Sequence, residues 1–125
     1  MNVVDSSAWL EYFANDSNAS FLARAIERTE KLLVPSLVVY EVFKRVLQQR
    51  DEGHALQAVA VMQQGTVVDL DARLALLAAR ISLERKLPMA DSVFLATARV
   101  YGATVWTQDA DFKDLPGVQF RRHTP

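Results

Sequence analysis

The chain has 125 residues, half of them hydrophobic, and a formal charge of −1 at pH 7. This length suits one domain with a single core, the apolar content excludes an intrinsically disordered chain, and the charge gives no global attraction to nucleic acid. Because cysteine is absent, no apolar run approaches the roughly 20 residues of a membrane span, and the acidic start lacks the basic region of a signal peptide, we expect a cytoplasmic protein.

The first half of the chain predicts two short strands and four helices. Met1 to Val4 is apolar and predicts a buried strand, after which Asp5-Ser6-Ser7 supplies residues that cap helices. Pro35-Ser36 favours an extended residue followed by a helix cap. In chain order, the expected elements are a strand over 1–4, helices over 8–14 and 19–29, a strand over 31–34, and helices over 36–50 and 53–64.

The second half predicts three more strands and two helices. Gly65 breaks the preceding helix, Asp71 caps the next one, and Gly102 ends the last as a C-terminal glycine. In chain order, the expected elements are a strand over 66–70, helices over 72–86 and 89–101, and strands over 103–107 and 118–120.

Strands that alternate with helices imply parallel crossovers and a sheet that is covered on both faces. The predicted strands are continuous apolar runs, which is typical of buried parallel strands. We therefore predict a three-layer α/β/α fold, with a short, mostly parallel sheet of about five strands flanked by helices. In such folds ligands bind beyond the C-terminal ends of the strands, and Asp5 and Asp109 directly follow the first and fourth strands.

Four carboxylates lie beside apolar segments, namely Asp5, Glu41, Asp91 and Asp109. Each has an ordinary explanation by itself: a helix cap, a solvated helix residue, a first-turn acid favoured by the helix dipole, and a turn residue. Their joint occurrence at strand ends and helix starts predicts one anionic pocket. A protein tolerates such a pocket when a divalent cation neutralises it.

Mg²⁺ or Mn²⁺ prefers oxygen ligands of this kind, and such ions activate water and stabilise the leaving oxygen in phosphodiester hydrolysis. Without metal, the acids would repel one another and some would have raised pKa values. Lys44 and Arg45 follow Glu41 on its helix and are either contacts for RNA phosphates or an ordinary solvated face. His54 and His123 are isolated in the sequence, so we expect both at the surface without an acid–base partner.

Four segments together resemble a known family. They are Val-Val-Asp5-Ser-Ser-Ala-Trp-Leu, Pro-Ser-Leu-Val-Val-Tyr-Glu41-Val, Leu-Pro-Met-Ala-Asp91-Ser-Val-Phe-Leu-Ala-Thr-Ala and Val-Trp-Thr107-Gln-Asp109-Ala-Asp-Phe. In this order and at this spacing the chain resembles PIN-domain proteins, in particular the VapC toxins of prokaryotic toxin–antitoxin pairs. The resemblance covers nearly the whole chain, which we therefore expect to be one PIN-like domain over residues 1–125.

This resemblance implies an Mg²⁺- or Mn²⁺-dependent endoribonuclease, a toxin that hydrolyses RNA phosphodiesters with a metal-activated water. It also implies a homodimer and a cognate VapB-like antitoxin that blocks the site. The catalytic set would be Asp5, Glu41, Asp91 and Asp109, and the metal ligands among them Asp5, Asp91 and Asp109.

Further roles follow from the same resemblance. The fourth acidic position is the least regular in the family, so Asp111 is the alternative to Asp109. Ser6 and Thr107 match positions that orient carboxylates or waters in such proteins.

Other interpretations of these residues remain. A PIN-type nuclease of RNA maturation, or one that acts on DNA, would use the same acids. A phospho-acceptor signalling domain is also a small doubly wound fold and would use Asp69 or Asp71 after the third strand, but it would leave Glu41 without a role. A catalytically silent member that only binds a partner would keep all four acids.

Overall fold

Five parallel strands form one sheet in the computed structural model, which describes residues 1–124. Their spatial order is β3-β2-β1-β4-β5, and every neighbouring pair is parallel. The chain therefore moves in one direction from β1 to β3 and then crosses to the other side of β1 for β4 and β5. The strands are β1 (Asn2–Val4), β2 (Leu32–Pro35), β3 (Thr66–Val68), β4 (Thr104–Thr107) and β5 (Val118–Phe120).

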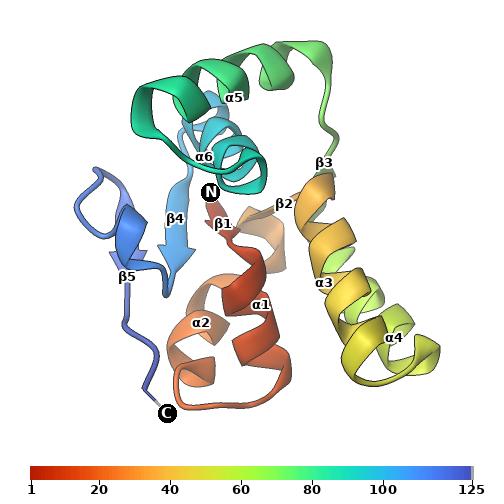
Figure 1. Ribbon diagram of the computed structural model, residues 1–125. Helices are drawn as coiled ribbons and strands as arrows, with labels where there is room; N and C mark the ends of the chain where they lie inside the picture. The colour runs from red at the N-terminus through yellow and green to blue at the C-terminus, as the bar shows by residue number, and fades with distance from the viewer. Residues whose placement is uncertain (125) are drawn as a thin grey trace.

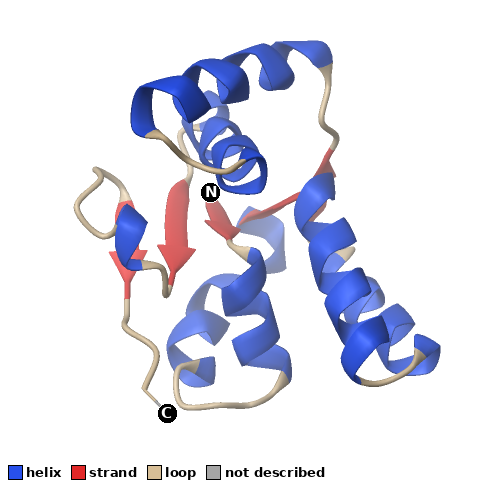
Figure 2. Ribbon diagram, in the orientation of Figure 1, coloured by secondary structure: helices blue, strands red, loops and turns tan. Residues whose placement is uncertain are grey.

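Helices cover both faces of this sheet (Figures 1 and 2). Helix α6 packs on β1, β2 and β4, whereas α1 and α2 contact β4 and β1 from the opposite face. This arrangement confirms the predicted three-layer α/β/α fold. The α-helices of residues 1–124 are α1 (Ser6–Phe13), α2 (Ala19–Ile26), α3 (Ser36–Gln49), α4 (Glu52–Met62), α5 (Ala72–Arg85) and α6 (Met89–Tyr101); short 3-10 turns cover Thr29–Lys31 and Ala110–Phe112.

The core lies on both sides of β1 and β2. Every residue from Ser92 to Ala98 is buried, because α6 is enclosed by the sheet and by α5. On the other face, Trp9 of α1 and Leu22 of α2 are fully buried. Each large apolar side chain buried in this way contributes about 1.5–3 kcal/mol. This packing fixes the ends of the strands and the first turns of the helices that follow them.

The cap of α3 differs from the sequence prediction, because the Ser36 side chain has a partner that is distant in the sequence. The N-cap of α3 is Pro35 rather than Ser36. The Ser36 hydroxyl instead accepts a hydrogen bond of 3.3 Å from the Leu70 N–H. At α1 the cap is Asp5, the first of the three capping residues Asp5-Ser6-Ser7 that the sequence offers. Gly102 ends α6 with a φ of 60°, as predicted from the sequence. None of the helices within residues 1–124 is both long and apolar enough to cross a membrane.

Candidate active site

The four predicted carboxylates lie along the C-terminal edge of the sheet, near the point where the strand order reverses between β1 and β4, but no three of them bring ligand atoms within 4.8 Å of one another. Asp5 directly follows β1, and Asp109 follows β4 after one intervening residue. Glu41 lies in the second turn of α3, which begins where β2 ends, and Asp91 lies in the first turn of α6. The three crossover connections of the sheet therefore place acids from four separate segments at its C-terminal edge.

Asp5 is buried, with 7% of its surface exposed, and both of its carboxylate oxygens are used. One oxygen caps α1 by accepting the Ala8 N–H at 2.9 Å and also accepts the Ser7 hydroxyl at 3.1 Å. The other accepts the hydroxyl of Thr107. Burial raises the pKa of Asp5, these hydrogen bonds oppose the rise, and the charge of Asp109 adds to it.

Thr107 connects the ends of the two central strands. Its side chain is fully buried, and its hydroxyl donates to Asp5 while accepting the Asp109 N–H at 2.8 Å. One hydroxyl group therefore sets the position of both segments that carry these acids. Ser6, the other predicted supporting residue, lies instead beside Glu41, and Ser7 takes the contact with Asp5.

Glu41 and Asp91 extend the cluster from the helices. Burial raises the pKa of Glu41, the Ser6 hydroxyl opposes the rise, and the charge of Asp5 adds to it. The pKa of Asp91 is raised to about 6, first by burial and then by the negative charges of Asp109, Asp5, Glu41 and Asp111. The Asp91 carboxylate therefore lies within electrostatic range of the other predicted acids.

The donor set fits a divalent cation. Within residues 1–124, the ion pairs are His54–Asp51 and His123–Glu11, so none of the four carboxylates is paired with a cationic side chain. A partly buried group of acids without a counter-charge is costly, and its raised pKa values show that cost. Hard oxygen ligands without histidine are the chemistry that Mg²⁺ and Mn²⁺ prefer.

Of the two acids that compete for the fourth position, Asp109 lies closer to the others. It is half-buried, caps the 3-10 turn by accepting the Asp111 N–H at 2.9 Å, and acts on the pKa values of both Asp5 and Asp91. Asp111 is exposed and acts only on Asp91, as the weakest of the four charges. Asp71, which a phospho-acceptor domain would use, caps α5 by accepting the Leu74 N–H at 2.9 Å.

A groove of about 660 Å³ opens beside Asp109 and Ser7. Arg45 lines it, whereas the Lys44 ammonium lies over the Tyr40 ring, 5.7 Å from its centroid. Of the two basic residues predicted to contact RNA, Arg45 therefore faces the acidic site. The groove is lined by Ser7, Leu10, Glu11, Ala14, Arg45, Gln49, Gln108, Asp109 and His123.

The PIN domain family profile matches residues 3–118. The chain belongs to the PIN-domain family. No curated protein sequence matches it. Among solved structures, a toxin–antitoxin complex from Klebsiella pneumoniae has a TM-score of 0.81 at 18% identity and covers 95% of this chain and 96% of that chain. Mycobacterium tuberculosis VapC20, described as a sarcin–ricin loop cleaving toxin, has a TM-score of 0.78 at 20% identity, with 94% and 97% covered. DNA-bound VapBC from Salmonella typhimurium has a TM-score of 0.73 at 17% identity, with 98% of each chain covered.

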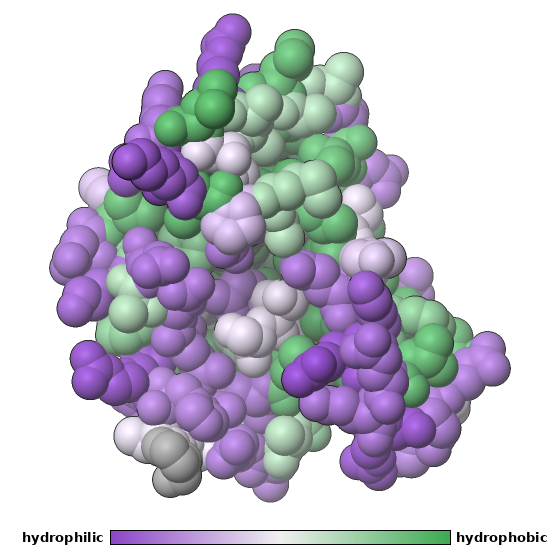
Figure 3. Space-filling model, viewed as in Figure 1, coloured by the Kyte–Doolittle hydropathy of each residue, from purple (hydrophilic) through white to green (hydrophobic). Residues whose placement is uncertain are grey.

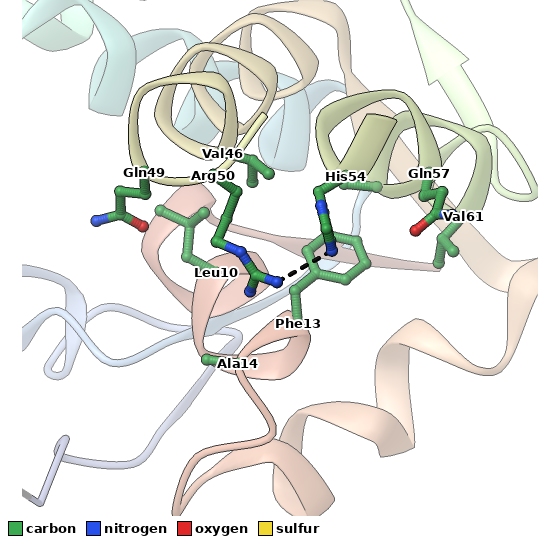
Figure 4. A pocket seen from close by; sticks show the side chains of 10 residues that line it. Leu10, Phe13, Ala14, Val46, Gln49, Arg50, His54, Gln57 and Val61 are labelled. Carbon is green, nitrogen blue, oxygen red and sulfur yellow. Dashed lines mark hydrogen bonds between the residues drawn. The ribbon is translucent and has the colours of Figure 1, made fainter. Parts of the chain in front are cut away.

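Both histidines of this PIN domain are exposed, as predicted, but the prediction that they lack partners is wrong. His54 Nδ1 lies 2.8 Å from Asp51, and its Nε2 lies 3.0 Å from the Arg50 guanidinium (Figure 4). His123 Nδ1 lies 3.1 Å from Glu11, a carboxylate of α1 with 7% of its surface exposed. The second pair joins residues more than a hundred positions apart, so no local spacing in the sequence indicates it.

A second acidic group lies outside the predicted set. Ligand atoms of Glu11, Asp16 and His123 all lie within 4.8 Å of one another. This group is anchored by hydrogen bonds: Glu11 accepts the Asn18 N–H at 2.9 Å, and Asp16 accepts the Ser17 N–H at 2.8 Å. The Glu11–His123 ion pair and these backbone contacts hold the group together, whereas within residues 1–124 the acids around Asp5 have no cationic partner.

An apolar hollow of about 350 Å³ lies between α1 and the α3–α4 hairpin of the PIN domain (Figure 4). Its apolar side chains are Leu10, Phe13, Val46 and Val61. The hollow and the polar groove adjoin, because both are lined by Leu10, Ala14 and Gln49. A continuous depression therefore runs from an apolar surface to the acidic site.

A Thr107→Val variant tests the link between the two central acids. Valine keeps the shape of threonine but removes the hydroxyl that serves Asp5 and Asp109. Loss of such an outer contact typically weakens metal binding or activity by about 10–100-fold, and we expect a loss in that range. Metal-dependent RNA cleavage at a series of Mn²⁺ concentrations measures it. Wild-type cleavage by the variant would show that the hydroxyl has no positioning role.

Proposed function

We propose that this PIN domain is a metal-dependent endoribonuclease and the toxin of a toxin–antitoxin pair that acts in the cytoplasm. The observation that carries the proposal is the cluster of carboxylates without cationic partners at the switch point of the sheet. Membership of the PIN-domain family and the fold shared with VapC20 support it.

In this proposal Asp5, Asp91 and Asp109 hold Mg²⁺ or Mn²⁺. When bound, the metal supplies Lewis-acid chemistry, which lowers the pKa of water and neutralises charge on a phosphate. The protein's part is to present three carboxylates on a rigid frame, with Asp5 held by Thr107 and Ser7. Holding the ligands in place before the metal arrives reduces the entropy lost on binding.

Glu41 is proposed to accept a proton from the attacking water. It is half-buried beside Asp5, and its pKa is raised above the usual value. A raised pKa brings a carboxylate closer to the operating pH and makes it a better proton acceptor. Arg45, at the groove wall, is proposed to bind an RNA phosphate near the cleaved one.

We further propose that a cognate VapB-like antitoxin occupies the apolar hollow between α1 and α3–α4. The hollow continues into the groove beside Asp109, so one bound segment can cover the hollow and block the site. The matched structures from Klebsiella pneumoniae and Salmonella typhimurium are toxin–antitoxin complexes, which supports a partner of this class. Co-expression of the antitoxin should relieve the toxicity of the wild type but not that of a Phe13→Glu variant. This result would support the proposed position of the antitoxin.

A second copy of the chain is the proposed partner of α5. Apolar side chains gather over the α5–α6 end of the molecule (Figure 3). The exposed apolar residues of α5 and of the start of α6 include Leu76, Leu83 and Met89, which are 67%, 84% and 69% exposed. Exposed apolar groups in such a cluster are typical of an interface. Light scattering is expected to give the mass of two chains; a monomer mass at micromolar concentration would contradict the homodimer.

The function is tested with purified protein and a labelled RNA. We expect cleavage with Mg²⁺ or Mn²⁺, none with EDTA, and recovery when metal is restored in excess. A matched single-stranded DNA separates RNA cleavage from a DNA-directed PIN nuclease. In cells, growth arrest by the wild type that is absent in Asp91→Asn favours the toxin over a nuclease of RNA maturation. Metal-independent cleavage, or no cleavage of any RNA, would contradict the proposal.

A further inference from the structure

We propose that the C-terminal segment Arg121–Thr124 forms one wall of the substrate groove, and that His123 is a positioning residue that contacts an RNA phosphate beside the cleaved one. Arg45 would contact the RNA from the opposite wall. The inference rests on the proposed nuclease function and adds to it the residues that position the substrate.

The segment is held in place along its length. The Arg121 N–H donates to the Thr107 carbonyl at 3.2 Å, and the Arg121 guanidinium lies over the Phe21 ring, 4.5 Å from its centroid. The Arg122 carbonyl accepts a hydrogen bond of 3.0 Å from the side-chain amide of Asn18, and this asparagine is only 3% exposed. The Ser17 hydroxyl donates to the Thr124 carbonyl at 3.0 Å. These contacts fix the segment between β4 and the α1–α2 loop.

His123 is oriented by a buried carboxylate. Its Nδ1 lies 3.1 Å from one oxygen of Glu11, and the other oxygen of Glu11 accepts the Asn18 N–H at 2.9 Å. Nearly half of the histidine side chain, 47%, is nevertheless exposed. With Nδ1 held by Glu11, Nε2 is the nitrogen available to a ligand, and it donates to a phosphate oxygen in the imidazolium form, in which both ring nitrogens carry a proton.

The chemistry of the groove favours a phosphate at this position. His123 and Arg45 line the same groove as Asp109 and Ser7. Asp109 and Glu11 line the groove and repel a polyanion, so RNA needs hydrogen-bond donors beside them. Arg45 and His123 are the cationic or potentially cationic side chains of the groove, and Gln49 and Gln108 supply neutral donors.

The test compares His123→Ala and Arg45→Ala with His54→Ala as a matched control. His54 has 48% of its side chain exposed and is paired with Asp51, yet it lies outside this groove. We expect His123→Ala to raise the KM for RNA about tenfold with kcat within twofold. His54→Ala should match the wild type, and His123→Arg should restore most of the affinity.

RNA binding in an Asp5→Asn background gives a second readout. Loss of one phosphate contact should reduce the salt dependence of log K by about 0.7 for single-stranded RNA, which a merely structural change would not do. Equal affinity of His123→Ala and His54→Ala, with a cleaving wild type, would overturn this inference alone. Loss of Mn²⁺ affinity in His123→Ala with unchanged RNA affinity would also overturn it in favour of a cation site at Glu11 and Asp16. A wild type that neither binds nor cleaves RNA would overturn the nuclease function as well.

Discussion

An Asp5→Asn variant is expected to retain its fold and to cleave RNA at least about a hundredfold more slowly than the wild type. Asparagine keeps the size of the side chain and an oxygen that can cap α1 at Ala8. It removes the negative charge and places an amide where the carboxylate accepts the Thr107 hydroxyl. Initial cleavage rates in saturating Mg²⁺ measure the loss, and circular dichroism checks the fold.

Asp71→Asn is the matched control for this variant. Asp71 caps α5 with the geometry that Asp5 has at α1, since both carboxylates accept a backbone N–H at 2.9 Å. The control therefore makes the same change at a helix start that lies outside the acidic cluster. We expect it to cleave at the wild-type rate, and equal rates for both variants would remove Asp5 from the catalytic set.

Asp91→Asn is expected to stabilise the metal-free protein while abolishing its response to metal. The pKa of Asp91 is about 6 in the folded chain, above the ordinary value of 3.8, because of burial and neighbouring acids. An acid with a raised pKa in the folded state is destabilising when ionised. This destabilisation is absent below pH 3.8 and complete above pH 6, so the metal-free protein should lose stability as pH rises through this window.

Removing the charge at pH 7.5 should therefore raise the free energy of unfolding by about 1 kcal/mol, allowing for the partial solvent exposure of the side chain. For a chain of this size the gain corresponds to roughly 3–5 °C in Tm. Thermal melts in EDTA at pH 7.5 and pH 4 measure the difference, which should shrink at the lower pH. Wild type should gain Tm with Mn²⁺ and Asp91→Asn should not. A variant that is less stable than wild type in EDTA would contradict the raised pKa.

Much of the fold follows from local pattern. The strands are short continuous apolar runs that alternate with helices, so a parallel sheet covered on both faces is the consistent arrangement. Met89–Tyr101 was predicted with its observed ends, because Pro88 and Gly102 mark both of them. The order of strands and helices also predicts that Asp5 and Asp109, which follow the first and fourth strands, share one edge of the sheet.

The fine structure of the site depends on contacts that are distant in the sequence. Thr107 reaches Asp5 across 102 positions, and this contact gives the carboxylate a second partner besides its helix cap. Capping therefore does not exclude the proposed site role, since Asp5 caps α1 with one oxygen and contacts Thr107 with the other. The Glu11–His123 pair was missed for the same reason, because only the packed tail brings the histidine to α1.

The carboxylates around Asp5 are proposed to hold the metal, and calorimetric titration with Mn²⁺ distinguishes them from the second acidic group. We predict saturable binding by the wild type, loss of at least about tenfold in affinity in Asp5→Asn, and wild-type affinity in Asp16→Asn, which alters the separate group of Glu11, Asp16 and His123. Binding that survives in Asp5→Asn but is lost in Asp16→Asn would contradict the account.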